Sequence, residues 1–227
     1  MDLRLPYLLF LSSGALLVGC AVTSSPPPFQ SIAYQPTDAK NITIKVSLQT
    51  MNTYVLEGDK LLLATPVTIG TDSDPTPTGD FKVFQKIERK RSNTYGFHVA
   101  ASGEIRPGER RHTPSGDRYV GYPMPYWLEF HPGYGFHSGG VWPQPRSHGC
   151  LRVHHTVAPK LFAMCPTGTK VIIADSLPED ATVGKMIVRP TDYADPDPPP
   201  SVLITSAAFP PPPSHLYQAG PAPLLPQ

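Results

Sequence analysis

Apolar and polar residues alternate along residues 42–48 of the chain. Ile42, Ile44, Val46 and Leu48 are separated by polar side chains. This period of two is the signature of a β-strand with one buried face. We therefore expect a strand here, and we expect the folded domain to begin with it.

Further strand-like stretches follow as far as residue 175. Glu57-Gly58-Asp59-Lys60 predicts a hairpin turn between two strands, and Thr76-Pro77-Thr78-Gly79 predicts a turn before another. Residues 91–118 are polar and rich in Gly and Arg, which favours a surface loop or hairpin that forms one wall of a cleft. The strand-like stretches are residues 52–70, 76–90, 119–130, 133–138 and 169–175.

One segment has helical rather than strand periodicity. Val157, Leu161 and Met164 recur at helical spacing, Thr156 is placed as an N-cap, and Pro159 then falls in the first turn, where its missing N–H is tolerated. The expected fold class is therefore mostly β with one short helix.

The two ends have a different composition from this domain. Residues 20–41 are rich in Ser, Pro and Thr and predict a flexible tether, and residues 175–227 contain proline runs that favour a disordered or semi-rigid tail. The folded domain is thus predicted over residues 42–174.

Residues 1–19 have the pattern of a signal peptide. Arg4 precedes an apolar run that is too short for a permanent membrane span. The run ends in Leu17-Val18-Gly19-Cys20, which resembles a lipobox and predicts lipidation of Cys20; ordinary secretion with an incidental cysteine is the alternative. Ala21 is not the aspartate of an inner-membrane retention signal, which favours the outer membrane if the cell is Gram-negative. We expect an extracytoplasmic protein held at a bacterial membrane.

Overall charge gives no reason to expect a nucleic-acid partner. The 227 residues carry 19 Lys and Arg against 18 Asp and Glu, a net charge of +1. There is no basic stripe that would follow a phosphate backbone. Nucleic acid is therefore excluded as an expected partner.

Cys150 is the most informative residue for chemistry. It follows His148 and Gly149, and His137 lies 13 residues before it. A cysteine nucleophile requires a thiolate, a base that accepts its proton, and N–H donors for a developing oxyanion. In an exported protein, however, Cys150 and Cys165 could instead form a disulfide.

A zinc site is a third interpretation of the same region. Its six potential ligands fall within 25 residues, but none of their spacings is a standard zinc pair. They are His131, His137, His148, Cys150, His154 and His155.

Taken together, these residues resemble the L,D-transpeptidases with a YkuD-type catalytic domain. The resemblance rests on Ser147-His148-Gly149-Cys150 with Arg152 after it, on His137 with Gly140 after it, and on three further elements in the same order. Those elements are residues 76–81, residues 124–126 and the closing helix with residues 168–173. Only nine residues, 138–146, separate His137 from Ser147, fewer than in many members of the family, and Arg152 replaces the asparagine of some members.

The resemblance implies a β-sandwich fold with the cysteine in a cleft, and it implies roles for individual residues. Cys150 would be the nucleophile, His137 its base and acid, and the Ser138 carbonyl would orient His137. His148, Gly149 and Cys150 would form the oxyanion site. Ser147 and Arg152 would shape the site or bind substrate; Tyr126 and Trp142 are candidate substrate contacts, with core packing the alternative for Tyr126.

The function implied is transpeptidation of peptidoglycan stem peptides. The cysteine would form a thioester with a stem tetrapeptide, release D-alanine and pass the acyl group to an amine, giving a 3→3 cross-link. The alternatives are hydrolysis of the same bond, attachment or release of a wall-bound protein, and a non-catalytic wall-binding lipoprotein with Cys150 in a disulfide. No metal or organic cofactor is implied, carbapenem-type β-lactams are expected inhibitors, and a monomer is expected.

Overall fold

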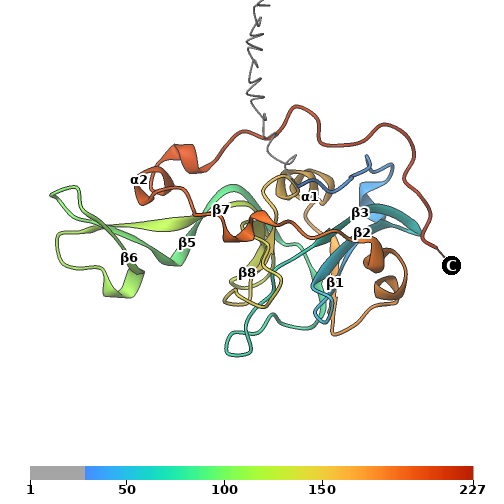
Figure 1. Cartoon of the computed structure of the whole chain (residues 1–227), viewed down its shortest axis with the longest axis horizontal. Helices are drawn as coiled ribbons and strands as arrows, with labels where there is room; N and C mark the ends of the chain where they lie inside the picture. The colour runs from blue at the N-terminus through green and yellow to red at the C-terminus, as the bar shows by residue number, and fades with distance from the viewer. Residues whose placement is uncertain (1–28, 227) are drawn as a thin grey trace, which may run out of the picture.

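The computed structural model describes residues 29–226 and contains two five-stranded sheets (Figure 1). The strand order is β3-β2-β1-β10-β4 in the first sheet and β6-β5-β7-β8-β9 in the second. The strands are β1 (Ile42–Ser47), β2 (Asn52–Glu57), β3 (Lys60–Pro66), β4 (Gly79–Lys82), β5 (Gln85–Val99), β6 (Ile105–Glu109), β7 (Arg118–His131), β8 (Tyr134–Ser138), β9 (Leu151–Val153) and β10 (Lys170–Ala174).

The first sheet follows the alternating pattern of the sequence. In β1 the apolar residues Ile42, Ile44 and Val46 are buried, whereas the intervening Thr43 and Lys45 are only partly so. β1 pairs antiparallel with β2 and parallel with β10. The expected strand and the expected mostly β class are thus confirmed.

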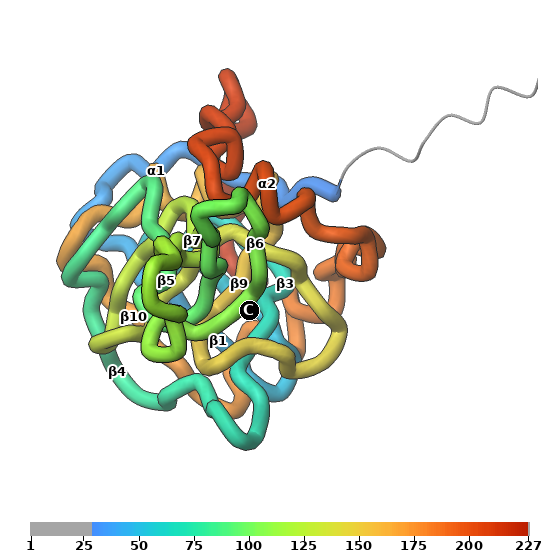
Figure 2. Tube along the Cα trace, turned by 90° about the vertical axis from the view of Figure 1, so that its left-hand side faces the viewer, coloured from blue at the N-terminus to red at the C-terminus, as the bar shows by residue number. Residues whose placement is uncertain are grey.

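The second sheet contains two long strands, β5 and β7, that extend beyond the body of the molecule. The far end of β5 pairs with β7 on one side and with β6 on the other, so the polar segment 91–118 forms a hairpin arm rather than an open loop. This arm projects from the body in Figure 1 and is seen end-on in Figure 2. Residues 92–95 of the arm line a cleft, as expected of this segment.

The core lies between the two sheets and beneath helix α1 (Ala158–Met164). Ile44 from the first sheet and Leu128 and Phe136 from the second are fully buried in one cluster, together with Leu161 of α1. Burial of each such side chain contributes about 1.5–3 kcal/mol to folding. This packing makes the sheets a sandwich and keeps the strands that carry the site in a fixed register.

The start of α1 differs from its predicted capping. Pro159 lies in the first turn as expected, but the N-cap residue is Val157 and has no side-chain cap. Thr156 instead donates from its hydroxyl to the Phe29 carbonyl at 2.8 Å. The tertiary contact with residue 29 competes with the local cap and replaces it.

Part of the expected tether packs on the domain. Ser31 and Ala33 are buried, the Ser31 hydroxyl donates to Thr65 at 3.1 Å, and Ala33 forms an isolated bridge with Leu63. Residues 29–34 therefore lie along the edge of the first sheet, a contact that their low apolar content does not predict.

The proline-rich tail also differs from the expectation of disorder. It crosses the molecule from the hairpin arm to the edge of the first sheet, where the chain ends (Figure 1). Individual polar contacts hold it in place: Asp180, for example, accepts hydrogen bonds from Ser47, Thr50 and Tyr54 at 2.7–2.8 Å. Its short helices are η3 (Pro178–Ala181), η4 (Val183–Met186), η5 (Asp192–Ala194), α2 (Pro200–Leu203) and η6 (Ser206–Ala208).

The predicted signal peptide, residues 1–19, and the predicted lipidation site Cys20 lie outside the described residues. Within residues 29–226, no helix has the length and apolar character needed to cross a membrane. Export and lipidation stay predictions from the sequence.

Candidate functional site

Two parallel strands of the second sheet bring Cys150 and His137 to the same place. In the β8–β9 pair, Phe136 lies opposite Leu151 and His137 opposite Arg152. Cys150 directly precedes β9, so it stands on the same face as Arg152, two residues away. Phe136 and Leu151 face the core, so their neighbours His137 and Cys150 face the opposite side of the sheet, where both line a cleft.

His137 is a buried, neutral imidazole. Its Nδ1 lies 2.8 Å from the Ser138 carbonyl oxygen, as the resemblance implies, and only 6% of the residue is exposed. Burial, and then the positive charge of Arg152, lowers the pKa of His137 to about 4. Because a carbonyl only accepts, the Nδ1 atom carries the hydrogen, and Nε2 keeps a lone pair that can accept a proton.

Cys150 is a thiol in its resting state. Burial raises its pKa, against the lowering effects of a hydrogen bond from the Gly135 N–H and the charge of Arg152. The sulfur lies 3.6 Å from the Gly133 carbonyl oxygen, to which its S–H donates. At neutral pH, the site therefore contains a protonated Cys150 thiol and a neutral His137 imidazole.

The turn that carries Cys150 requires glycine at position 149. Gly149 has a φ of +91°, a conformation that side chains disfavour, and a Cβ atom there would collide with the ring of Tyr134. The Ser147 hydroxyl donates to the Cys150 carbonyl at 2.6 Å and accepts from the Gly149 N–H at 3.2 Å. The turn is thus closed by its own residues.

This bonding favours the first of the two roles expected of Ser147, shaping the site, and differs from the oxyanion role expected of Gly149. Ser147 is only 2% exposed and its hydroxyl is committed to the backbone on both sides, so it holds the turn rather than contacting a substrate. The Gly149 N–H is engaged with that hydroxyl and is not free to stabilise an oxyanion. A serine hydroxyl has one donor and two acceptor lone pairs. The Gly149 N–H and the Cys150 carbonyl are close to Ser147 in sequence, so its hydroxyl bonds to them first.

Thr76 is a contributor to the site to which the sequence assigned no role. Its buried hydroxyl accepts from the Gly70 N–H at 2.9 Å and donates to the Gly149 carbonyl at 3.0 Å. The loop between β3 and β4 is thereby joined to the Cys150 turn. The only available signal was the position of Thr76 within the motif at residues 76–81.

Arg152 lies between the two reactive residues and the tail. Burial lowers its pKa, and the nearby groups that favour its charge include Tyr122, Cys150 and Asp197. Tyr122 donates from its hydroxyl to Asp197 at 2.9 Å, and burial followed by that carboxylate raises the pKa of Tyr122 to about 12. Tail residue Asp197 thus belongs to the site, although nothing in the proline-rich sequence around it indicates this.

The cleft has a volume of about 1020 Å³. Its walls come from the hairpin arm, the sheet beneath, the short loop 139–149 and tail residues 192–198. Such a volume lies at the upper end of the range for ligand pockets and can accommodate a peptide segment.

Trp142 lies in this cleft, as expected. Its ring contacts the Arg146 guanidinium, whose central carbon is 3.8 Å from the ring centroid, and the ring of Tyr193, 5.0 Å away between centroids. The exposed side chain of His148 stacks on Tyr95 of β5, with 4.4 Å between ring centroids. These aromatic side chains form flat surfaces along the cleft.

Tyr126 does not line the cleft, and its assignment as a substrate contact is wrong. It is 7% exposed, packs against Phe162 of α1, and donates from its hydroxyl to the Pro210 carbonyl at 3.3 Å. Successive side chains in a strand point to opposite faces. The next residue, Trp127, is therefore the one that lines the cleft, with its ring 6.2 Å from that of His137.

The two other interpretations of Cys150 receive no support from the geometry. Cys150 and Cys165 are free thiols among the described residues; Cys165 is fully buried at the end of α1, where burial raises its pKa to about 12. Among the described residues, the one group of three possible metal ligands is His154, His155 and Asp192 of the tail, and it does not include Cys150.

Comparison with known proteins identifies the domain. A family model described as the L,D-transpeptidase catalytic domain, YkuD, matches residues 41–173, which is more than half of the chain. No curated protein matches the chain.

Several solved structures resemble it at low identity. The L,D-transpeptidase (Yku) from Stackebrandtia nassauensis is 22% identical over 64% of this chain and 60% of its own, with a TM-score of 0.45. An Enterococcus faecium L,D-transpeptidase mutant is 24% identical over 59% and 50%, with a TM-score of 0.43. The Ldtfm–avibactam carbamoyl enzyme is 25% identical over 60% and 50%, with a TM-score of 0.45. The chain thus spans half to three fifths of these proteins.

Proposed function

Because the chain belongs to the family of L,D-transpeptidases with a YkuD catalytic domain, we propose that it is a peptidoglycan L,D-transpeptidase with Cys150 as its nucleophile. The observation that carries the proposal is the placement of Cys150 and His137 on one face of the β8–β9 pair, in a cleft of about 1020 Å³. Arg146 and Arg152 in that cleft supply positive charge for the carboxylates of a stem peptide.

The first step forms a thioester. His137 Nε2 accepts the proton of the Cys150 thiol while the sulfur attacks the carbonyl carbon of the amide between the L-centre of a diamino acid and D-alanine. The oxyanion is stabilised by the backbone N–H groups of His148 and Cys150, which have no hydrogen-bond acceptor among residues 29–226.

The intermediate then collapses and expels the amine. The C–N bond breaks, and the proton held on His137 passes to the departing nitrogen of D-alanine. The acyl group stays on the Cys150 sulfur as a thioester, and His137 is again neutral, which agrees with a pKa of about 4. Cys150 and His137 are then ready for the second half of the reaction.

The acceptor completes the cycle. An amine of a second stem peptide attacks the thioester, loses a proton to His137, and releases the thiol with formation of a 3→3 cross-link. Water in place of the amine gives an L,D-carboxypeptidase or endopeptidase, and a protein lysine gives attachment to the wall. The non-catalytic alternative requires a Cys150 disulfide, and both thiols of the domain are free.

The setting proposed for this chemistry is the cell envelope. A chain exported by residues 1–19 and lipidated at Cys20 would be held at a membrane, monomeric, with its domain beside peptidoglycan. Carbapenem-type β-lactams would acylate Cys150 and act as inhibitors.

Product analysis tests the proposal. The protein is incubated with a disaccharide tetrapeptide, with and without a free amine acceptor, and the products are separated by liquid chromatography and mass spectrometry. We expect release of D-alanine together with cross-linked dimer, and neither product with Cys150→Ser. Tripeptide alone, formed equally in the presence of the amine, would instead assign a hydrolase, and no D-alanine at all would contradict the function.

A further inference from the structure

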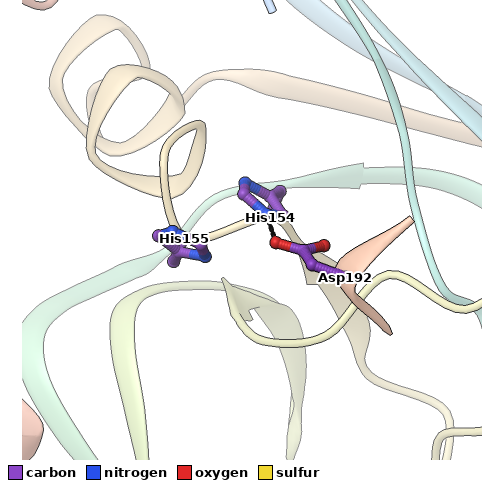
Figure 3. Close-up of side chains that lie close together, drawn as sticks. All are labelled: His154, His155 and Asp192. Carbon is purple, nitrogen blue, oxygen red and sulfur yellow. Dashed lines mark hydrogen bonds and ion pairs between the residues drawn. The ribbon is translucent and has the colours of Figure 1, made fainter. Parts of the chain in front are cut away.

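Two histidines and an aspartate form a second cluster at the tail side of the cleft (Figure 3). His154 and His155 directly follow β9, and Asp192 begins η5 of the tail. One ligand atom from each of the three lies within 4.8 Å of the others, and all three residues line the cleft. The transpeptidase chemistry uses none of them.

The hydrogen bonds of His154 indicate which of its two ring nitrogens carries the hydrogen. The Thr156 hydroxyl donates its hydrogen to the Phe29 carbonyl at 2.8 Å, so its oxygen is left to accept from His154 Nδ1, also 2.8 Å away. The opposite tautomer would rely on the longer 3.3 Å bond from the Thr156 N–H to Nδ1. We therefore assign the hydrogen to Nδ1, on the basis of the shorter contact.

With its hydrogen on Nδ1, the buried His154 directs a lone pair at a carboxylate. Its Nε2 lies 2.9 Å from Asp192 Oδ2, and two electron-rich atoms at that distance require a cation between them. A second proton is one such cation and a metal ion is another. Histidine ligands of metals characteristically donate their other ring N–H to an oxygen, as His154 does to Thr156.

The remaining two members can complete a metal site. His155 follows His154 directly and is exposed, so its ring can turn toward the same point, and Asp192 Oδ2 already faces His154 Nε2. Imidazole nitrogen and carboxylate oxygen are common ligands of transition metals.

We propose that His154, His155 and Asp192 bind a divalent transition metal ion, with Zn²⁺ the best match to two nitrogen ligands and one oxygen ligand. Ligand atoms about 3.3 Å apart are needed for tetrahedral bonds of about 2.0–2.1 Å. The His154–Asp192 pair must open slightly and the exposed His155 must rotate inward. The fourth position faces the cleft, and the ion joins η5 to β9, which fixes the tail wall of the cleft.

Zinc titration of the full chain carrying Cys150→Ser tests this site, because that substitution removes the competing thiol and makes the result independent of the transpeptidase activity. By isothermal titration calorimetry we expect one Zn²⁺ per chain with a dissociation constant in the micromolar range or lower. His155→Ala and Asp192→Asn should each weaken binding at least tenfold, and Thr156→Val about tenfold through the lost hydrogen bond to His154. His215→Ala, which removes an exposed tail histidine, is the matched control and should bind Zn²⁺ as tightly as the parent, the chain that carries Cys150→Ser alone.

A second readout separates loss of the site from loss of the fold. Saturating Zn²⁺ should raise the thermal midpoint of the parent but not of His155→Ala, whose exposed side chain leaves folding intact. Absence of stoichiometric binding, or equal affinity in His155→Ala and Asp192→Asn, would overturn the proposal. The pair of His154 and Asp192 would then be a proton-bridged anchor for the tail.

Discussion

At the scale of the residue, the site is defined by the protonation of two side chains. His137 is buried and Cys150 is partly buried, and burial disfavours the charged form of each side chain, so the thiol and the neutral imidazole are the stable pair. A preformed thiolate–imidazolium pair, as used by some cysteine enzymes, is disfavoured here. The proton must therefore move during attack, and its acceptor is His137.

The pH dependence of acylation follows from the lowered pKa of His137. A base must be neutral to act, and this imidazole stays neutral down to a pH of about 4 rather than 6.5. We expect kcat/KM for acylation to stay level from neutral pH downward and to fall only near pH 4. His137→Gln should reduce the rate of acylation by about 10²–10⁴ and remove this acid limb, the fall in kcat/KM near pH 4. An acid limb near 6.5 would contradict the proposed environment of His137.

Arg152 should control the position of the same acid limb. Its positive charge opposes protonation of His137 and lowers the pKa of Cys150. In Arg152→Met the acid limb should therefore move to higher pH, and acylation at neutral pH should slow by on the order of tenfold, about one pKa unit of interaction. The control is Arg118→Met, an exposed arginine of β7. If both variants have the same profile, the Arg152 charge does not act on the site.

At the scale of the element, the strands were predictable and the turn that carries the nucleophile was not. The alternation of residues 42–48 predicts β1 because burial of one face dominates a strand. The Cys150 turn depends instead on the local hydrogen bonds of Ser147 and on the bond from Thr76 to the Gly149 carbonyl, which joins residues 73 positions apart in sequence. No local pattern encodes so distant a partner, which is why the sequence assigned Thr76 no role.

Thr76→Val tests the connection between the β3–β4 loop and the turn. The substitution preserves shape but leaves the Gly70 N–H and the Gly149 carbonyl without their partner. We expect a loss of about 1–3 kcal/mol in the free energy of unfolding, measured in urea, and slower acylation. Thr78→Val, at an exposed position two residues away, should change neither quantity. Equal stability of the two variants would rule out the connection.

At the scale of the whole molecule, the tail completes the domain. Its proline runs predict disorder because they lack the periodicity of a core element, yet single residues hold it: Leu203 is buried, Pro210 accepts from Tyr126, and Asp197 accepts from Tyr122. The same Tyr126 contact explains the wrong substrate assignment. A partner 84 residues distant cannot be read from the sequence around either residue.

Removal of residues 192–227 tests the contribution of the tail. Loss of the buried Leu203 side chain should lower the free energy of unfolding by about 1.5–3 kcal/mol. Each hydrogen bond lost with the tail, those of Tyr122 and Tyr126 among them, should lower it by roughly 1 kcal/mol more. Because one wall of the cleft is also lost, KM should rise more than kcat falls. Urea unfolding and steady-state kinetics measure the two effects, and unchanged values would mean that the tail does not pack in solution.

The nucleophilic role of Cys150 is tested most directly by intact-protein mass spectrometry after incubation with a carbapenem under non-reducing conditions. We predict one covalent adduct per chain, absent in Cys150→Ser and retained in Cys165→Ala, which removes the fully buried thiol. An adduct that persists in Cys150→Ser, or no adduct together with a mass two hydrogens below that of the free dithiol, would contradict the assignment.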